Sequence, residues 1–137
     1  MRRFVALLAT LALTSCEGRP GGLTGITPLN LPAIKLAMLS QPSDEAVGSP
    51  ITPVIQVAVQ NGSNQTVTTT TASISVVITP ATNTTNAVLT GTTIANPTSS
   101  GIAVFSDLRI SQPGTGYTLT FSAPGLTSVV SAPFNIQ

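Results

Sequence analysis

The side chains that could carry out chemistry are few in this chain of 137 residues. It contains no histidine, one cysteine, Cys16, and four carboxylates, Glu17, Asp44, Glu45 and Asp107. Without histidine, the Ser-His and Cys-His pairs that activate a nucleophile cannot form, and the usual histidine-containing metal sites are excluded. A glycosidase needs two carboxyl groups about 5 to 10 Å apart in a cleft, whereas Asp44 and Glu45 are neighbours in one loop and Asp107 follows a different strand. We therefore expect no enzyme activity, no cofactor and no catalytic residue.

The first 15 residues have the order of an export signal. Residues 1–3 give a positively charged start, residues 4–13 are apolar but too few to span a bilayer, and small residues follow. The tetrad Leu13-Thr14-Ser15-Cys16 resembles the lipobox of bacterial lipoproteins. That resemblance implies that the signal is cut before Cys16 and that its thiol carries a diacylglycerol, so the membrane is a partner through a lipid anchor. The alternative is an ordinary signal peptide that ends near a cysteine.

The residues around Cys16 also bear on location. A lone cysteine in an exported protein cannot close an intramolecular disulfide, which agrees with lipidation. Glu17 stands where an aspartate favours retention in the inner membrane, so we expect an anchor in the outer membrane of the cell envelope, on its periplasmic or its surface face. Past residue 16 three basic residues remain against four carboxylates, a formal balance of −1. No basic patch exists that could bind nucleic acid.

Between the leader and the domain, residues 16–34 are predicted to form a tether. After Cys16 they are rich in glycine and proline and show no period of two or 3.6, so no stable helix or strand is expected there. The remaining residues, 35–137, suffice for one small domain. Only 7% of the whole chain is charged, against about 25% in typical globular proteins.

The clearest strand pattern in that domain is Gly114–Ala123. Tyr117, Leu119, Phe121 and Ala123 alternate with small polar residues, which is the period of a strand with one buried and one solvated face. We expect a central strand of a β-sandwich. Tyr117 follows a glycine turn, the place where sandwiches of the immunoglobulin type bury a tyrosine ring and bond its hydroxyl to nearby backbone.

Six further strands are predicted around it, with turns rich in Gly, Pro and Asn between them. We expect Gly91 to form a bulge, Phe105 to face inward, and Ser106-Asp107 to interrupt the fifth strand. The last strand should bury Val130, Ala132, Phe134 and Ile136. The six strands are expected near residues 36–38, 51–60, 72–78, 88–95, 101–110 and 130–136.

Four segments together resemble the bacterial Ig-like repeats of large surface proteins: residues 36–43, 101–110, 114–120 and 131–136. The resemblance covers nearly all of residues 35–137 and implies a single seven-stranded antiparallel Ig-like β-sandwich. It brings no catalytic motif. Those repeats usually occur in tandem, whereas this chain has one copy.

Two stretches have a functional interpretation beside a structural one. Asp44 and Glu45 either bind calcium at the end of the sandwich or form a solvated turn; Ca²⁺ takes six or more oxygen ligands. The run Thr66–Thr71 either forms an exposed edge that accepts a partner strand or a solvated strand, because threonine suits a pleated surface.

These observations predict a lipid-anchored, exported, non-catalytic module. The expected role is interaction or adhesion at the cell surface, with a protein or glycan ligand held by loops or an edge strand. The alternative is a periplasmic accessory or scaffolding lipoprotein of an envelope complex. A contiguous apolar patch on one sheet would favour the alternative, and polar faces covered by threonine would favour the surface module.

Overall fold

The structure, a computed structural model, describes residues 31–137. The predicted signal peptide, the lipidation site Cys16 and most of the predicted tether lie outside the described residues. No helix among the described residues is long and apolar enough to cross a membrane. The strands are β1 (Lys35–Met38), β2 (Ile55–Gln60), β3 (Ile74–Ile78), β4 (Leu89–Thr90), β5 (Ile94–Ala95), β6 (Ile102–Phe105), β7 (Arg109–Ile110), β8 (Gly114–Tyr117), β9 (Leu119–Ser122), β10 (Val129–Val130) and β11 (Phe134–Ile136).

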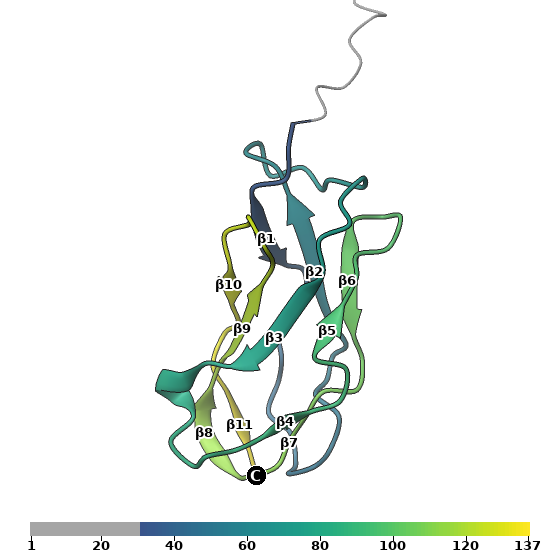
Figure 1. Cartoon of the computed structure of the whole chain (residues 1–137). Coiled ribbons are helices and arrows are strands. Elements are labelled where there is room, and N and C mark those ends of the chain that lie inside the picture. The colour runs from purple at the N-terminus through teal and green to yellow at the C-terminus, as the bar shows by residue number, and fades with distance from the viewer. Residues whose placement is uncertain (1–30) are drawn as a thin grey trace, which may run out of the picture. The chain divides into compact units, whose positions relative to one another are not determined.

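The strands form an antiparallel all-β sandwich, as predicted (Figure 1). One sheet has the order β1-β2-β6 and the other β10-β9-β3-β5, and two small sheets, β11-β8 and β4-β7, lie toward one end. Two isolated parallel bridges, Lys35 with Thr127 and Glu45 with Ile136, join segments distant in sequence. The strand count differs from the expected seven because several predicted strands break into two short ones that pair in different sheets.

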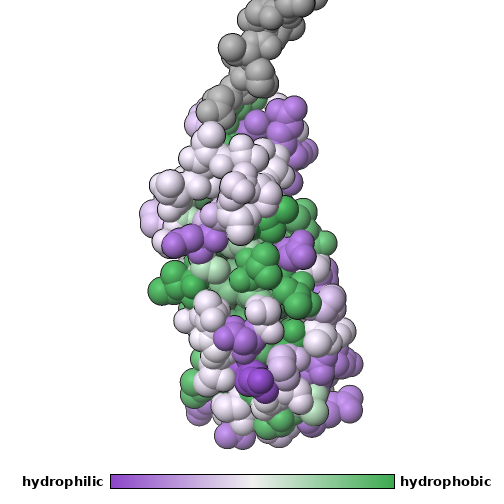
Figure 2. Space-filling view, turned by 90° about the vertical axis from the view of Figure 1, so that its right-hand side faces the viewer, coloured by the Kyte–Doolittle hydropathy of each residue, from purple (hydrophilic) through white to green (hydrophobic). Residues whose placement is uncertain are grey.

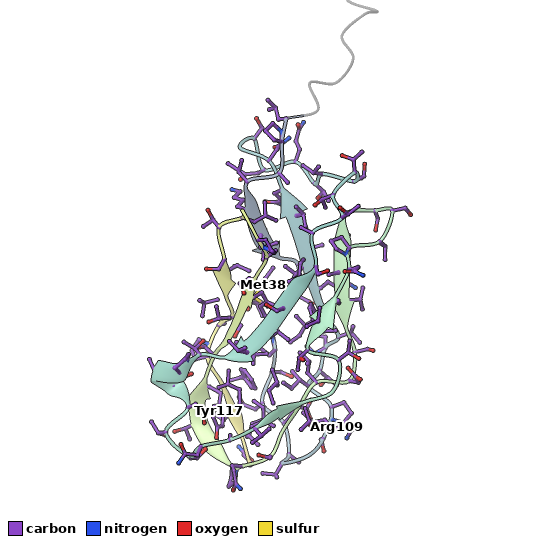
Figure 3. The ribbon with its side chains drawn as sticks, viewed as in Figure 1. Met38, Arg109 and Tyr117 are labelled. Atoms are coloured by element: carbon purple, nitrogen blue, oxygen red, sulfur yellow. The ribbon has the colours of Figure 1, made fainter. Side chains whose placement is uncertain are left out.

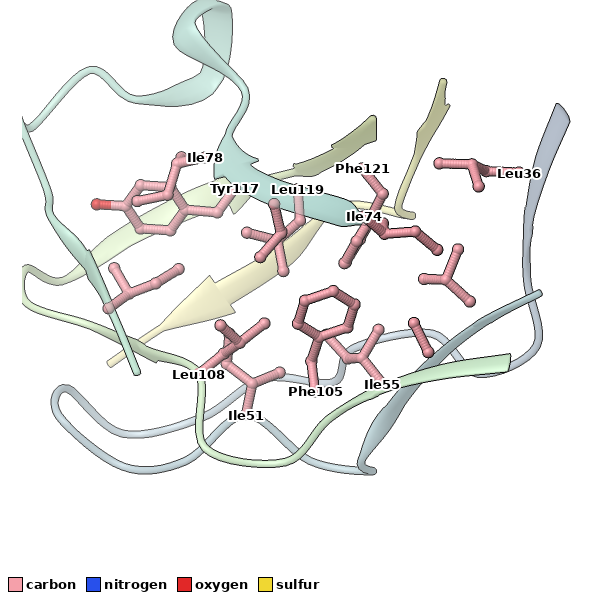
Figure 4. Packing of buried hydrophobic residues seen from close by; sticks show 14 of the residues in the cluster. Leu36, Ile51, Ile55, Ile74, Ile78, Phe105, Leu108, Tyr117, Leu119 and Phe121 are labelled. Atoms are coloured by element: carbon pink, nitrogen blue, oxygen red, sulfur yellow. The ribbon is translucent and has the colours of Figure 1, made fainter. Parts of the chain in front are cut away.

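The core lies between the two large sheets (Figure 4). Phe105 of β6 meets Phe121 of β9 with ring centroids 5.3 Å apart and planes at 60°. Such an edge-to-face pair contributes about 0.5 to 1.5 kcal/mol beyond the area it buries. Phe105 faces inward as predicted, and Leu108 and Ile110 return to the same interior after the predicted interruption.

The predicted strand Gly114–Ala123 has the expected buried and solvated faces, but it is not one continuous strand. Its apolar members are buried as expected, yet the strand divides at Thr118 into β8 and β9. The break is held by Thr118, whose carbonyl accepts from the Thr79 N–H at 2.8 Å and whose N–H donates to the Thr82 hydroxyl at 3.1 Å. β8 then pairs with β11, and β9 with β3 and β10.

The expectation for Tyr117 is confirmed. Its ring is buried, and its hydroxyl lies 3.2 Å from the Gln112 carbonyl and 3.4 Å from the Pro113 carbonyl. The same hydroxyl also contacts that of Thr85. Tyr117 and Arg109 lie on opposite sides of this end of the domain (Figure 3). Through its hydroxyl contact with Thr85, Tyr117 fastens the loop that contains Thr85 to the core.

The last predicted strand is wrong in its first half. Val130 is 50% exposed and Ala132 is exposed, whereas Phe134 and Ile136 are buried. The buried residue between them is Ser131, whose hydroxyl accepts from the Leu119 N–H at 2.9 Å and donates to the Ala132 carbonyl. This side-chain pairing shifts the alternation by one residue and separates β10 from β11.

Two other predicted segments also differ. The second strand begins at Ile55 and not at Ile51, although Ile51 is buried, because Pro53 has no N–H to donate to a sheet ladder. The run Thr66–Thr71 forms no strand, so it is neither the accepting edge nor the solvated strand that the sequence left as alternatives. Its segment folds back onto the domain through the Val67 N–H, which donates to the Val59 carbonyl at 2.8 Å.

Candidate functional site

The acidic pair Asp44 and Glu45 lies beside the last strand. Both Asp44 carboxylate oxygens accept from Asn135, one from its backbone N–H at 2.7 Å and one from its side-chain amide at 3.0 Å. Glu45 accepts from the Thr52 hydroxyl, and its backbone bridges to β11. Within residues 31–137 no three acidic, cysteine or histidine side chains gather as a metal site would require. These contacts tie β11 to the segment between β1 and β2.

Asp107 occupies a different part of the molecule. Its carboxylate accepts from the Thr92 N–H at 2.8 Å and from the Thr92 hydroxyl at 2.9 Å. These two hydrogen bonds, the backbone one first, hold the pKa of Asp107 below its ordinary value, and Arg109 adds a smaller effect of the same sign. Asp107 therefore fixes the path of the chain around Thr92.

Gly91 lies at the start of that path. The sequence predicts a bulge there within one strand, but the structure breaks the strand into β4, which pairs with β7, and β5, which pairs with β3. Gly91 has φ +101°, and a Cβ at this position would lie 2.3 Å from the carbonyl oxygen of Asp107. Only glycine fits this approach. Gly91 and Asp107 together direct the chain from one sheet to the other.

This change of sheet leaves a groove between β3 and β4. Its volume is about 360 Å³, within the range of small binding sites. None of its lining residues carries a charge, and Val77 and Val88 on its walls are 52% and 58% exposed. We call it the β3–β4 groove, and it is lined by Val76, Val77, Ile78, Asn83, Ala87, Val88, Leu89 and Thr93.

One wall of the groove is an open strand edge. β3 pairs with β9 along its length, but β5 covers only its first half, and the last hydrogen bond on that side runs from the Val76 N–H to the Thr93 carbonyl at 2.9 Å. Backbone groups alternate sides along a strand, so the N–H and C=O of Ile78 also face away from β9. Among the described residues neither group has a hydrogen-bond partner in the protein.

The opposite wall has the same property. β4 pairs with β7, and the Ser111 N–H donates to the Val88 carbonyl at 3.1 Å. The alternation therefore directs the N–H and C=O of the next residue, Leu89, away from β7. In the part of the chain that the structure describes, these two groups are also unpaired. The groove thus has unpaired strand groups on both sides.

The end of the groove is closed by an ordered loop. Pro80 begins a 3₁₀ turn, Pro80–Thr82, directly after β3. The Asn83 side chain then holds Ala87 from both sides, accepting from its N–H at 2.8 Å and donating to its carbonyl at 2.9 Å. With Thr85 held against Tyr117, this loop is fixed before any ligand arrives.

The outer face of β3 and β9 is covered by paired hydroxyls. Each pair joins the two strands or the turn beside them, with oxygens 2.8 to 3.2 Å apart: Ser75 with Ser122, Thr79 with Thr120, and Thr82 with Thr118. Cross-strand hydroxyl pairs of this kind suit a solvated face. The side that carries β5 and β6 differs, since a band of hydrophobic side chains crosses it (Figure 2); Ile94 and Val104 are the exposed apolar residues of these two strands.

Sequence reasoning did not find the groove. It considered an open edge only at Thr66–Thr71, as one of two alternatives, whereas the open edge lies on β3 beside a strand that had been predicted as continuous. The signals present were Pro80 directly after a strong strand and Gly91 within a weak one, and neither shows which strands will separate.

In comparisons with known proteins, no protein-family model and no curated protein matches this chain.

Proposed function

We propose that this protein is a lipid-anchored, exported, non-catalytic interaction module of Ig-like type that acts at the bacterial cell surface. The observation that carries the proposal is the hydroxyl-covered outer face of β3 and β9, where three side-chain pairs replace the apolar surface that a permanent partner would cover. A polar face of this size is stable in contact with water. Its two exposed valines, Val77 and Val130, stand apart on either side of Thr120.

The anchor in this proposal is Cys16. Its thiol would take a diacylglycerol through a thioether, and the signal would be cut immediately before it. Two or more acyl chains make membrane attachment stable, whereas one chain gives only reversible binding. The interaction surface would then be held close to the membrane by the tether of residues 16–34.

The periplasmic accessory role is the second candidate, and one observation favours it. The hydrophobic band on the side of β5 and β6, which includes Ile94 and Val104, could pack against another envelope protein. The two candidates differ in which side of the outer membrane holds the domain.

Protease shaving of intact cells tests the proposal. Cells carrying the full-length protein with a C-terminal tag are treated with a protease that cannot enter them. Loss of the tagged domain from intact cells is the expected result. A Cys16→Ala variant should lose its membrane anchorage, which shows that attachment depends on the lipid. Protection of the domain until the outer membrane is breached would overturn the surface role and favour the periplasmic one.

A further inference from the structure

We propose that the β3–β4 groove binds an extended, uncharged segment of a partner protein, which enters as an additional strand between β3 and β4. The inference rests on the proposed interaction role and names the site and the kind of ligand. It does not depend on which side of the outer membrane the domain occupies.

The backbone of the two walls specifies a strand. Ile78 on one wall and Leu89 on the other each offer an N–H and a C=O without a partner in residues 31–137. An extended peptide presents the same groups on both of its edges, so it can bond both walls at once. The groove therefore resembles a missing strand in a sheet more than a pocket for a small molecule.

The side chains specify a neutral strand. No lining residue carries a charge, so a charged group brought against these walls would lose hydration without an ion pair to compensate. Val77 and Val88 are exposed on either side and offer apolar contact to alternate residues of the bound segment. Asn83 at one end and Thr93 at the other supply the only polar side chains.

The ends of the groove limit the length of the segment. At one end the Val76 N–H is already bonded to Thr93. At the other end Pro80 has no N–H to offer, and its carbonyl accepts from Asn83. The bound strand is consequently short. Its site is ordered in advance, because Asn83 holds Ala87 and Asp107 holds Thr92, so little conformational freedom is lost on binding.

The test uses a blocked synthetic pentapeptide of alternating threonine and valine, added to the isotope-labelled full-length protein in detergent. Amide hydrogen exchange is followed by NMR. At saturating peptide the amides of Ile78 and Leu89 should exchange at least about tenfold more slowly, with no change at Val59 in the other sheet. Two further versions of the peptide, each N-methylated on one of the two alternate sets of amides, should each lose the protection at one wall only, because successive amides of an extended strand face opposite walls.

Two matched variants sharpen the test. Val77→Lys places a charge on the groove wall and should weaken peptide binding about tenfold or more. Val130→Lys places the same charge on an equally exposed valine in the same cross-strand row, on the far side of Thr120, and should leave binding unchanged.

Three results would overturn the inference: absence of protection at millimolar peptide, equal loss of binding in both variants, or protection that appears without peptide as protein concentration rises. The last would show that a second copy of the chain occupies the groove. Failure of the surface role would appear only in protease shaving, so the two proposals can fail separately.

Discussion

Ile74 and Ile78 occupy equivalent positions on the same edge of β3, yet their surroundings differ. Both side chains point into the core and both backbones direct their polar groups away from β9. Ile74 is paired with Ala95 of β5. Ile78 has no partner on that side among the described residues. One strand is therefore an interior strand at its start and an edge strand at its end.

The difference arises in the segment that runs beside β3 and not in β3 itself. Gly91 and Asp107 draw the segment before β5 toward β7, which uncovers the end of β3. Natural proteins blunt such edges with proline or by making them short, and Pro80 does this here. What remains open is a short gap with a defined shape, which is suited to recognition of a strand more than to uncontrolled aggregation.

The largest expected effect is in amide exchange of the unliganded protein. The Ile74 amide should open only with the sheet, while the Ile78 amide should exchange about 1,000-fold faster or more, because no hydrogen bond protects it. NMR exchange on the full-length protein measures both residues in one sample. Equally slow exchange at the two sites would mean that the groove is closed in solution.

The next largest effect concerns the core that both halves of β3 share. Phe121 lies opposite Val76, where the two halves meet, and packs on Phe105. Phe121→Ala should cost about 3 to 5 kcal/mol of folding free energy, enough to unfold a small domain. The control, Thr120→Ala, removes a surface hydroxyl pair with Thr79 and should cost well under about 1 kcal/mol. Equal losses in urea denaturation would show that the two faces of β9 have been assigned wrongly.

Gly91→Ala tests the turn at which the chain passes from β4 in one sheet to β5 in another. The substitution combines a positive φ with a Cβ placed against the Asp107 carbonyl, so we expect a loss of about 2 to 4 kcal/mol in folding free energy. Gly125→Ala is the matched control, because Gly125 has φ +74° but nothing within 4 Å of the added Cβ. It should lose only about 1 to 2 kcal/mol. Thermal or urea unfolding measures the loss in both variants. Equal losses would show that the contact between Gly91 and Asp107 adds nothing to the cost of the positive φ.

The sequence was sufficient for the fold class because the strongest strands are read from alternation alone. The buried residues of β3 and β9, and Phe105 of β6, follow a period of two that hydrophobic burial imposes. Tyr117 was also predictable, since a buried phenol needs a partner for its hydroxyl and the nearest backbone supplies one.

The alternation of apolar and polar residues predicted the wrong buried face where a side-chain hydroxyl took the place of a backbone partner in the sheet. Ser131 is buried because its hydroxyl bonds the backbone of Leu119, and this reverses the faces of Val130 and Ala132. The groove was not predictable for a similar reason. It depends on which sheet β4 joins, and that choice is set by a tertiary contact between Gly91 and Asp107 that no local pattern records.

The smallest expected effect is the pH dependence of that contact. The Thr92 N–H and hydroxyl lower the pKa of Asp107 in the folded state, so the ionised form stabilises the fold, and this contribution is present above the ordinary carboxyl pKa. It should be lost as pH falls below about 4 toward the lowered value. Comparison of the wild type with Asp107→Asn by urea unfolding from pH 7 to pH 2 isolates it, because the two proteins differ in this side chain alone. The stability difference should be constant from pH 7 to 5 and shrink at lower pH. A difference that stays constant to pH 2 would show that the Asp107 charge has no part in holding Thr92, and that the position of the groove wall depends on Gly91 alone.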